Sequence, residues 1–320
     1  MVGYVRLLLA TGVMLSHLGI TLAGYNIGVM SVVIFFLLAG STTSFLFNKI
    51  YVDHPQRIRA FYQDRIKRLF PLYLYVLALV AIFIYATGHG QPTSSPWPWL
   101  LNALIVPLNY YMVFSADVLA EPALIAIPAA WSLGLELQVY ILLPLLLLYK
   151  PLRKIAFASS LLIYLVAASG IIDTDIWGYR LLPGTLFIFL IGVAMRQQLS
   201  AEKPIWTLWW LFWLAGFMAV YIDAFVWDDI RSFRLETLVG LVIGVPLLIL
   251  LRRISWQLPA NRWCADMSYG LFLTHSLDIV LLEYFSINVY SMTEKVILLF
   301  GLSLALALPG VLVTNKLYKR

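Results

Sequence analysis

The chain has 320 residues, of which 62% are hydrophobic and only 12% are charged, and its formal net charge is +6. Average soluble domains are about 25% charged, and a soluble fold of this length could not bury so much apolar surface. The composition therefore predicts an all-α fold, a bundle of helices that crosses a membrane several times. The single cysteine, Cys264, excludes a disulfide framework and a cysteine-based metal site. The basic residues lie between apolar runs, so membrane topology explains the net charge better than nucleic-acid binding does.

Apolar runs of about 20 residues predict ten transmembrane helices in a single domain that spans residues 1–320. The first run is predicted to be a retained span rather than a cleaved signal peptide, because its only early charge is Arg6 and Leu22-Ala23-Gly24 is a poor cleavage site. Residues 97–114 are interrupted by Pro107 and Asn109, and they are predicted to form a re-entrant or interfacial segment. The predicted spans are residues 3–23, 27–48, 69–87, 129–149, 154–171, 180–197, 204–223, 235–251, 266–285 and 295–315.

The basic residues predict which side of the membrane each loop faces. With ten spans and a cytoplasmic N-terminus, all but four of the 22 Lys and Arg residues fall on the inner side, as the positive-inside rule requires. A full span at 97–114 would invert the later loops and place Lys150, Arg153 and Lys154 outside. Both termini are therefore predicted to be cytoplasmic. The four basic residues on the outer side are Arg180, Arg231, Arg234 and Lys295.

Two ionisable side chains, Arg6 and His17, share one face of the first predicted span. Their spacing leaves them about 20° apart around a helix and about 16 Å apart along it. Ionisable residues inside a bilayer are costly, so they are candidates for function. Alternatively, Arg6 anchors the helix at the inner surface, and His17 is a hydrogen-bonded core residue.

The fourth predicted span opens with WSLGLELQVYILLP, in which Ser132, Glu136 and Tyr140 recur every four residues and so share a face. Glu136 would lie about 12 Å below the outer surface, where a carboxylate must be paired or protonated. The pattern indicates either a functional carboxylate or a buried structural hydrogen-bond network.

The ninth predicted span carries SYGLFLTHSLD, which places Ser268 and His275 on one face and Asp278 three residues after His275. Side chains three positions apart on a helix can touch, so Asp278 is predicted to hold the His275 ring. By helix rise, His17, Glu136 and His275 lie at comparable depths, about 15–21 Å from the inner face, and are predicted to converge. The alternative is a polar pair that only joins two helices.

Three further arginines suit anionic ligands. Arg65 and Arg68 lie one helical turn apart at the inner mouth of the third span, and two guanidinium groups on one face can bind a polyphosphate. Ordinary topology signals explain the same two residues. Arg180 lies on the outer side, where an acidic loop residue, an anionic acceptor or a lipid headgroup would be its partner.

Taken in order, these motifs resemble those of the integral-membrane acyltransferase 3 family. The resemblance covers nearly the whole chain, and its most specific block is WSLxxE. This chain has Ala39-Gly40 where the family usually has Ser-Gly, so we expect close helix packing at Gly40 but no role for that serine hydroxyl. The motifs that carry the resemblance are Arg6-x10-His17, FFLLAG, Arg65-x-x-Arg68, WSLGLELQVYILLP, YRLLPGTLFIFLIG and SYGLFLTH.

The resemblance implies a membrane O-acyltransferase, most simply an O-acetyltransferase. Its donor would be cytoplasmic acetyl-CoA or another acyl-CoA, and it would need no metal. The acceptor would be a hydroxyl of an extracytoplasmic or lipid-linked polysaccharide. The enzyme would be a multi-pass protein of the inner (plasma) membrane, in contact with membrane lipid but not with nucleic acid, and polysaccharide-synthesis machinery is a candidate partner.

The same resemblance suggests roles for individual residues. His17 would act as the base or carry the acyl group, and Glu136 would orient the imidazole or the acceptor. His275 would be a second proton-transfer or thioester-binding group. Coenzyme A would bind to Arg6, Arg65 and Arg68, and the predicted substrate-binding residues are Ser132, Tyr140, Arg180 and Asp278.

Two functions of other classes fit the same residues. Intramembrane His, Glu and Arg also suit a proton-coupled transporter or flippase of a lipid-linked or anionic solute. A non-catalytic subunit of a polysaccharide export complex is the third candidate. Only an acyltransferase would consume acyl-CoA and release free thiol, so dependence on coenzyme A separates the three.

The predicted topology can be tested by labelling single cysteines introduced at Lys150 and at Ser200. Both should react with a membrane-impermeant reagent from the cytoplasmic side, because the distribution of basic residues places both loops inside. Labelling of position 150 from the outside would show that the ten-span arrangement is wrong.

Overall fold

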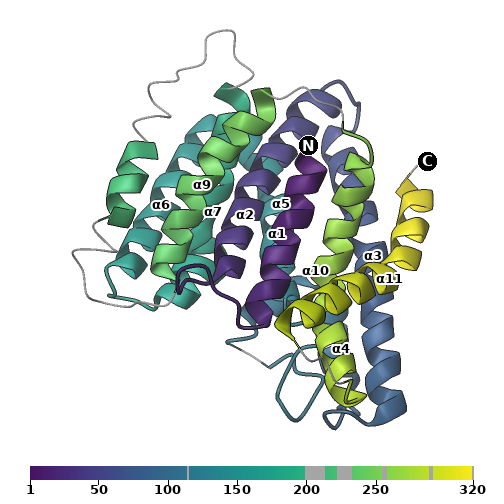
Figure 1. The fold of residues 1–320 in the computed structure, drawn as a ribbon. Helices are drawn as coiled ribbons and strands as arrows, with labels where there is room; N and C mark the ends of the chain where they lie inside the picture. The colour runs from purple at the N-terminus through teal and green to yellow at the C-terminus, as the bar shows by residue number, and fades with distance from the viewer. Residues whose placement is uncertain (114, 199–212, 222–232, 254–257, 288–290, 319–320) are drawn as a thin grey trace. The chain divides into compact units, whose positions relative to one another are not determined.

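The computed structural model describes residues 1–113, 115–198, 213–221, 233–253, 258–287 and 291–318, and within these ranges its regular elements are all helices (Figure 1). The chain forms two compact units. Apart from Met1, the first comprises residues 19–62 and 138–258, and the second comprises residues 2–18, 63–137 and 259–320. Two helices, α3 (Arg57–Thr87) and α5 (Ala130–Leu148), contribute residues to both units.

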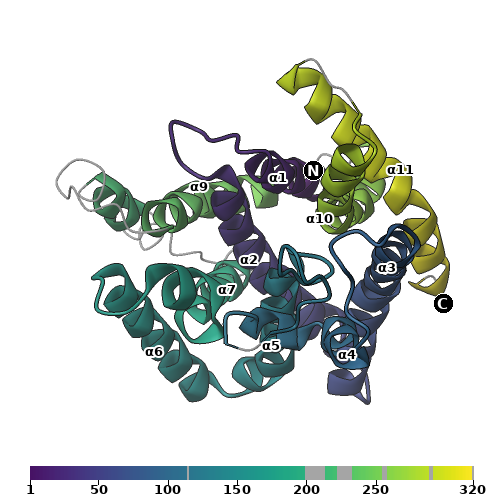
Figure 2. The same ribbon diagram turned by 90° about the horizontal axis from the view of Figure 1, so that it is seen from below.

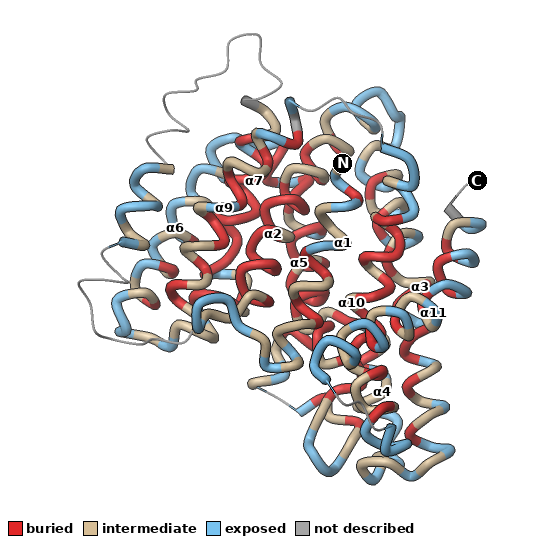
Figure 3. Tube along the Cα trace, viewed as in Figure 1, coloured by how far each residue is buried: buried red, intermediate tan, exposed pale blue. Residues whose placement is uncertain are grey.

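The first unit is built around α2 (Ile27–Phe45), whose residues are mostly buried (Figure 3). Asn26 caps this helix, because its Oδ1 accepts hydrogen bonds from the N–H groups of Gly28 at 2.9 Å and Val29 at 3.2 Å. α2 packs against α7 (Leu182–Gln198) and α9 (Arg234–Arg253), and α7 packs against α6 (Lys150–Ala168). Two π-helical turns, η1 (Leu46–Ile50) and η3 (Ile176–Arg180), also belong to this unit.

A glycine sets the distance between α2 and α7. A Cβ atom on Gly40 would lie 1.9 Å from the carbonyl oxygen of Phe189, so only glycine permits this approach of the two backbones. The predicted close packing at Gly40 is therefore confirmed. The rings of Phe36 and Phe189 stack beside it with centroids 4.7 Å apart.

The second unit contains α10 (Asn261–Tyr284), which packs against α1 (Val2–His17) and also against α11 (Met292–Tyr318) (Figure 2). α1 and α10 run in the same direction. At their N-terminal ends the Gly3 N–H donates to Asn261 Oδ1 at 2.8 Å, and at the other end the rings of His17 and His275 lie 5.0 Å apart between centroids. A Cβ atom on Gly3 would lie 1.8 Å from the Asn261 carbonyl oxygen, so glycine permits this contact.

Residues 97–114 do not form a spanning helix in the part that the structure describes. α4 (Pro96–Leu104) has 9 residues, and η2 (Val106–Tyr110), a 3₁₀ helix, has 5, whereas a bilayer core needs about 20. The side chain of Asn102 forms hydrogen bonds with backbone groups in and around these two short helices. Its side chain donates to the carbonyls of Pro98 and Ala116 and accepts from the Ala126 N–H.

Seven of the described helices are long and apolar enough to cross a membrane. α1 is apolar but shorter, and α10, which carries Asp266 and Asp278, is not among the seven. Of the predicted span 204–223, residues 204–212 and 222–223 lie outside the described residues, and 213–221 are helical. The structure therefore supports a multi-pass helical membrane protein, while the count of ten stays a prediction. The seven are Ile27–Ile50, Arg57–Thr87, Ala130–Leu148, Lys150–Ala168, Ile176–Gln197, Arg234–Leu251 and Met292–Leu317.

Two predicted helix ends are wrong. The first helix ends at His17 rather than at residue 23, and Gly19 follows with a φ of 77°, the left-handed conformation that commonly ends a helix. His17 therefore lies in the last turn of α1 rather than inside a longer span. α3 begins at Arg57, twelve residues before the predicted start at 69, because the basic segment before the apolar run is itself helical.

Replacing Gly3 by alanine should destabilise the second unit. The new methyl group would force α1 away from α10 and strain the bond to Asn261, at a cost of about 1–3 kcal/mol. Gly301, in α11, has no neighbour within 4 Å of an added Cβ, so Gly301→Ala is the matched control and should be neutral or slightly stabilising. Thermal unfolding of the purified protein in detergent measures both. Equal melting temperatures for the two variants would contradict the close packing.

Candidate active site

The candidate site is centred on two histidines that the parallel packing of α1 and α10 brings together. The ring centroids of His17 and His275 are 5.0 Å apart, and the rings are tilted by 49°. The two predicted histidines therefore lie side by side, while the predicted convergence of Glu136 with them stays a prediction. The two rings differ in exposure, since His17 is exposed and His275 is 0% exposed. His17 is thus the accessible member of the pair, and His275 is buried beside it.

The buried ring of His275 is fixed by its own helix. Its Nδ1 lies 3.1 Å from the carbonyl oxygen of Leu271, one turn earlier. A carbonyl only accepts hydrogen bonds, so Nδ1 carries the hydrogen, and in the neutral ring Nε2 holds the lone pair. Nε2 has no hydrogen-bond partner among the described residues. His275 is therefore held in one tautomer with its basic nitrogen unused.

Asp278 does not hold His275 as the spacing predicted. Its carboxylate is 0% exposed and accepts a hydrogen bond from the hydroxyl of Ser303 on α11. Residues three apart on a helix differ by about 60° in direction, and here that difference separates their partners. His275 contacts α1, whereas Asp278 contacts α11. The carboxylate is covered in this structure, and its predicted role in substrate binding stays a prediction.

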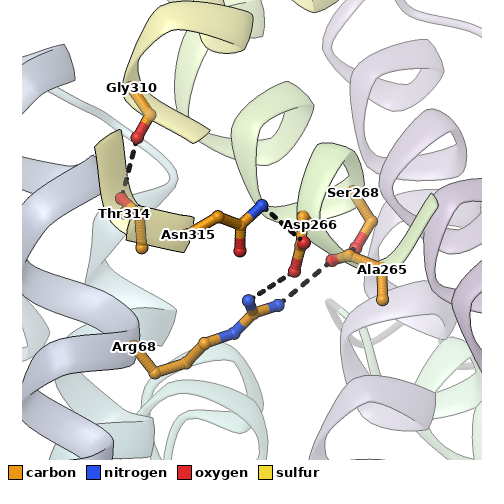
Figure 4. A network of polar contacts seen from close by, with 7 residues as sticks. All are labelled: Arg68, Ala265, Asp266, Ser268, Gly310, Thr314 and Asn315. Atoms are coloured by element: carbon orange, nitrogen blue, oxygen red, sulfur yellow. Dashed lines mark hydrogen bonds and ion pairs between the residues drawn. The ribbon is translucent and has the colours of Figure 1, made fainter. Parts of the chain in front are cut away.

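Arg68 connects three helices at the N-terminal part of α10. Its Nη1 forms an ion pair with Asp266 Oδ1, its Nη2 donates to the carbonyl of Ala265 at 3.4 Å, and Asn315 of α11 donates to the other oxygen of Asp266 at 3.0 Å (Figure 4). Arg65 forms an ion pair with the adjacent Asp64. Two of the three predicted donor-binding arginines, Arg65 and Arg68, therefore have acidic partners within the protein.

The other predicted residues of the second unit lie on α1 and α5. Arg6 is half-buried on the helix that ends at His17, and Glu136 is half-buried near the start of α5. Ser132 is buried and donates to the carbonyl of Ala129 at 3.1 Å. The roles predicted for these three residues in donor binding, orientation and acceptor binding stay predictions.

Two predicted residues belong to the first unit. Tyr140 is buried, with its ring 6.3 Å from that of Phe61 between centroids. Arg180 Nε lies 2.7 Å from Asp175 Oδ1. Of the partners predicted for Arg180, the structure contains the acidic residue, Asp175.

Sequence reasoning missed Asp266, Asn315 and Ser303, which are the partners of the predicted residues. The signal for Asp266 and Ser303 was available, because a charged or polar residue in an apolar span is a candidate by itself. Their pairing was not available, since it depends on how α10 and α11 are aligned. In the part of the chain that the structure describes, no group of three His, Cys, Asp or Glu side chains is arranged to hold a metal ion.

Comparisons with known proteins agree with this arrangement of motifs. A family model described as an acyltransferase domain matches residues 2–315. An uncharacterized protein of Aquifex aeolicus (strain VF5) is 36% identical over 190 residues, which cover 57% of this chain and 81% of that protein. Nodulation protein 10 of Rhizobium leguminosarum bv. viciae is 27% identical over 275 residues, which cover 77% of this chain and 70% of that protein. No solved structure matches the chain.

The bond between Ser303 and Asp278 should stabilise the contact of α10 with α11. Ser303→Ala removes the donor to a buried carboxylate, and an unsatisfied buried group costs about 1–3 kcal/mol. Ser169→Ala makes the same chemical change at an exposed site and should have little effect. Thermal unfolding in detergent compares the two variants with the unmodified protein. A Ser303→Ala protein as stable as the Ser169→Ala protein would contradict the assignment.

Proposed function

The chain belongs to the integral-membrane acyltransferase 3 family, and from this premise we propose that it is an O-acyltransferase, most simply an O-acetyltransferase, that uses cytoplasmic acyl-CoA. The proposed acceptor is a hydroxyl of an extracytoplasmic or lipid-linked polysaccharide. The observation that carries the proposal is the contact between the ring of His17, an exposed residue, and the buried ring of His275. A reactive imidazole open to substrate and backed by a fixed second imidazole suits the removal of a hydroxyl proton.

In the direct route, a ring nitrogen of His17 takes the proton of the acceptor hydroxyl as its oxygen attacks the thioester carbonyl. The carbon–sulfur bond then breaks, the acyl group stays on the acceptor oxygen, and the coenzyme A thiolate leaves and takes up a proton. In the two-step route, the His17 nitrogen attacks the thioester carbonyl, and the carbon–sulfur bond breaks to release the coenzyme A thiolate, which takes up a proton. The acceptor hydroxyl then attacks the acyl group, the nitrogen–acyl bond breaks, and the hydroxyl proton passes to the freed imidazole or to water. The exposure of His17 suits both routes.

His275 acts through His17 in this proposal, because a side chain that is 0% exposed does not touch substrate. With Nδ1 bonded to the Leu271 carbonyl, Nε2 is the nitrogen that can accept a proton or a hydrogen bond from a neighbouring group. The resemblance suggested direct proton transfer or thioester binding by His275, and its burial favours the indirect role instead. Glu136 remains the proposed orienting carboxylate.

The parallel direction of α1 and α10 supports the proposed topology. If two helices cross a membrane in the same direction, the chain between them must cross the membrane an odd number of times. The seven spans predicted between 27 and 251 meet this requirement, and an added crossing at 97–114 would not. We therefore propose an inner (plasma) membrane protein with both termini in the cytoplasm, where acyl-CoA is available.

Acyl-CoA turnover in proteoliposomes separates the proposed enzyme from a transporter or flippase. The enzyme should release coenzyme A thiol in the presence of acceptor, whereas a transporter or flippase would move its solute without releasing thiol. Mass spectrometry of surface glycans from a deletion strain then identifies the acceptor, since these glycans should lack an acyl-sized increment. Intact acylation in that strain, with no thiol released by the purified protein, would overturn the proposal.

His17→Gln should reduce turnover by about 10²–10⁴-fold, because glutamine keeps much of the size of histidine but cannot act as a base. The variant should remain folded and in the membrane. His54, an exposed loop residue of the other unit, provides the control His54→Gln, which should retain activity. If His17→Gln turns over acyl-CoA within a few-fold of the parent, His17 is structural.

A further inference from the structure

Asp266 lies where three helices of the second unit meet. One carboxylate oxygen pairs with Arg68 of α3, and the other accepts from Asn315 of α11 at 3.0 Å, while the residue itself belongs to α10 (Figure 4). The side chain is 7% exposed. With both oxygens bonded to different helices, the carboxylate cannot rotate, so it presents a fixed anion to the guanidinium.

The Arg68 guanidinium is held at one edge, and its side chain is partly exposed. The described residues use two of its five N–H donors, one for Asp266 and one for the Ala265 carbonyl. Its side chain is 21% exposed. The hollow beside it, lined by Arg68, Leu72, Asp266, Tyr269, Val311, Thr314 and Asn315, has a volume of about 10 Å³, which is room for about one water molecule. Donors of Arg68 therefore remain for a ligand while its position is fixed.

We infer that Asp266 is the positioning residue that holds Arg68 ready for the phosphate groups of the acyl donor, and that Asn315 holds Asp266 in turn. The inference rests on the proposed function, in which Arg68 binds coenzyme A. An arginine side chain that is already ordered loses less conformational entropy when it binds, and its planar fork keeps the direction of its hydrogen bonds. Asp266 also compensates the charge of Arg68 before a donor arrives.

The test compares two donors, acetyl-CoA and acetyl-pantetheine, which has the same thioester but no phosphate. Asp266→Asn keeps the size of the side chain and removes its charge. It should raise the KM for acetyl-CoA about tenfold, with little change in kcat or in the KM for acetyl-pantetheine. Asn315→Ala leaves the ion pair but removes the hydrogen bond from Asn315 to the Asp266 carboxylate. It should raise the KM for acetyl-CoA by a smaller factor.

Tyr75→Phe is the matched control. The Tyr75 hydroxyl donates to the carbonyl of Leu306 at 3.1 Å, which is another bond between helices of this unit, α3 and α11, that does not involve a guanidinium. Its loss should leave both KM values unchanged. Arg68→Ala and the double variant Arg68→Ala/Asp266→Asn should have the same KM for acetyl-CoA, because Asp266 acts only through Arg68.

The charge-swapped variant Arg68→Asp/Asp266→Arg tests the structural alternative. It restores an ion pair between α3 and α10 but moves the guanidinium to the other helix, so it should fold without recovering affinity for acetyl-CoA. Recovery of that affinity would overturn the inference. An Asp266→Asn protein with the parent's KM for acetyl-CoA would also overturn it. The same holds if Asp266→Asn raises the KM for acetyl-CoA and for acetyl-pantetheine equally. If the parent itself neither binds nor consumes acyl-CoA, the proposed function fails first and the inference fails with it.

Discussion

The close parallel contact of α1 with α10 is the constraint on which the candidate site depends. Gly3 sets the distance between the helices, and its bond to Asn261 sets their register. His17 and His275 each lie fourteen residues further along, and both helices rise about 1.5 Å per residue, so the two rings arrive at the same level about 21 Å away. A shift by one residue would turn one ring by about 100° and separate the pair.

Different side chains of α10 contact different helices of the second unit. Near its N-terminal end, Asp266 joins Arg68 and Asn315. About two and a half turns later His275 contacts α1, and a little more than three turns later Asp278 contacts Ser303 of α11. These polar side chains explain why α10 is not among the seven helices that are long and apolar enough to span a membrane. Buried polar groups are tolerated when they have partners, and the partners of α10 lie on three different helices.

The apolar runs of the sequence predicted where helices lie, because a membrane leaves the backbone few alternatives. Depth along each span also predicted that His17 and His275 would be neighbours. The end of α1 at His17 was not predictable from apolarity alone, since residues 18–23 are as apolar as those before them. The left-handed backbone conformation of Gly19 ends the helix. The partners of charged side chains were missed for another reason. Asp266 and Arg68 are 198 residues apart, and no local pattern encodes which side chains meet across that separation.

The pairing of α1 with α10 also fixes when this unit can assemble. The bond between Gly3 and Asn261 joins residues 258 positions apart, and ribosomes add about 5–20 residues per second. The start of α10 is therefore synthesised on the order of tens of seconds after α1. During that interval Gly3 and the polar end at His17 have no α10 to pack against. Although α1 is synthesised before the other described helices, it is thus among the last of them to pack, and a chain that stops short of α10 leaves α1 without its main packing partner.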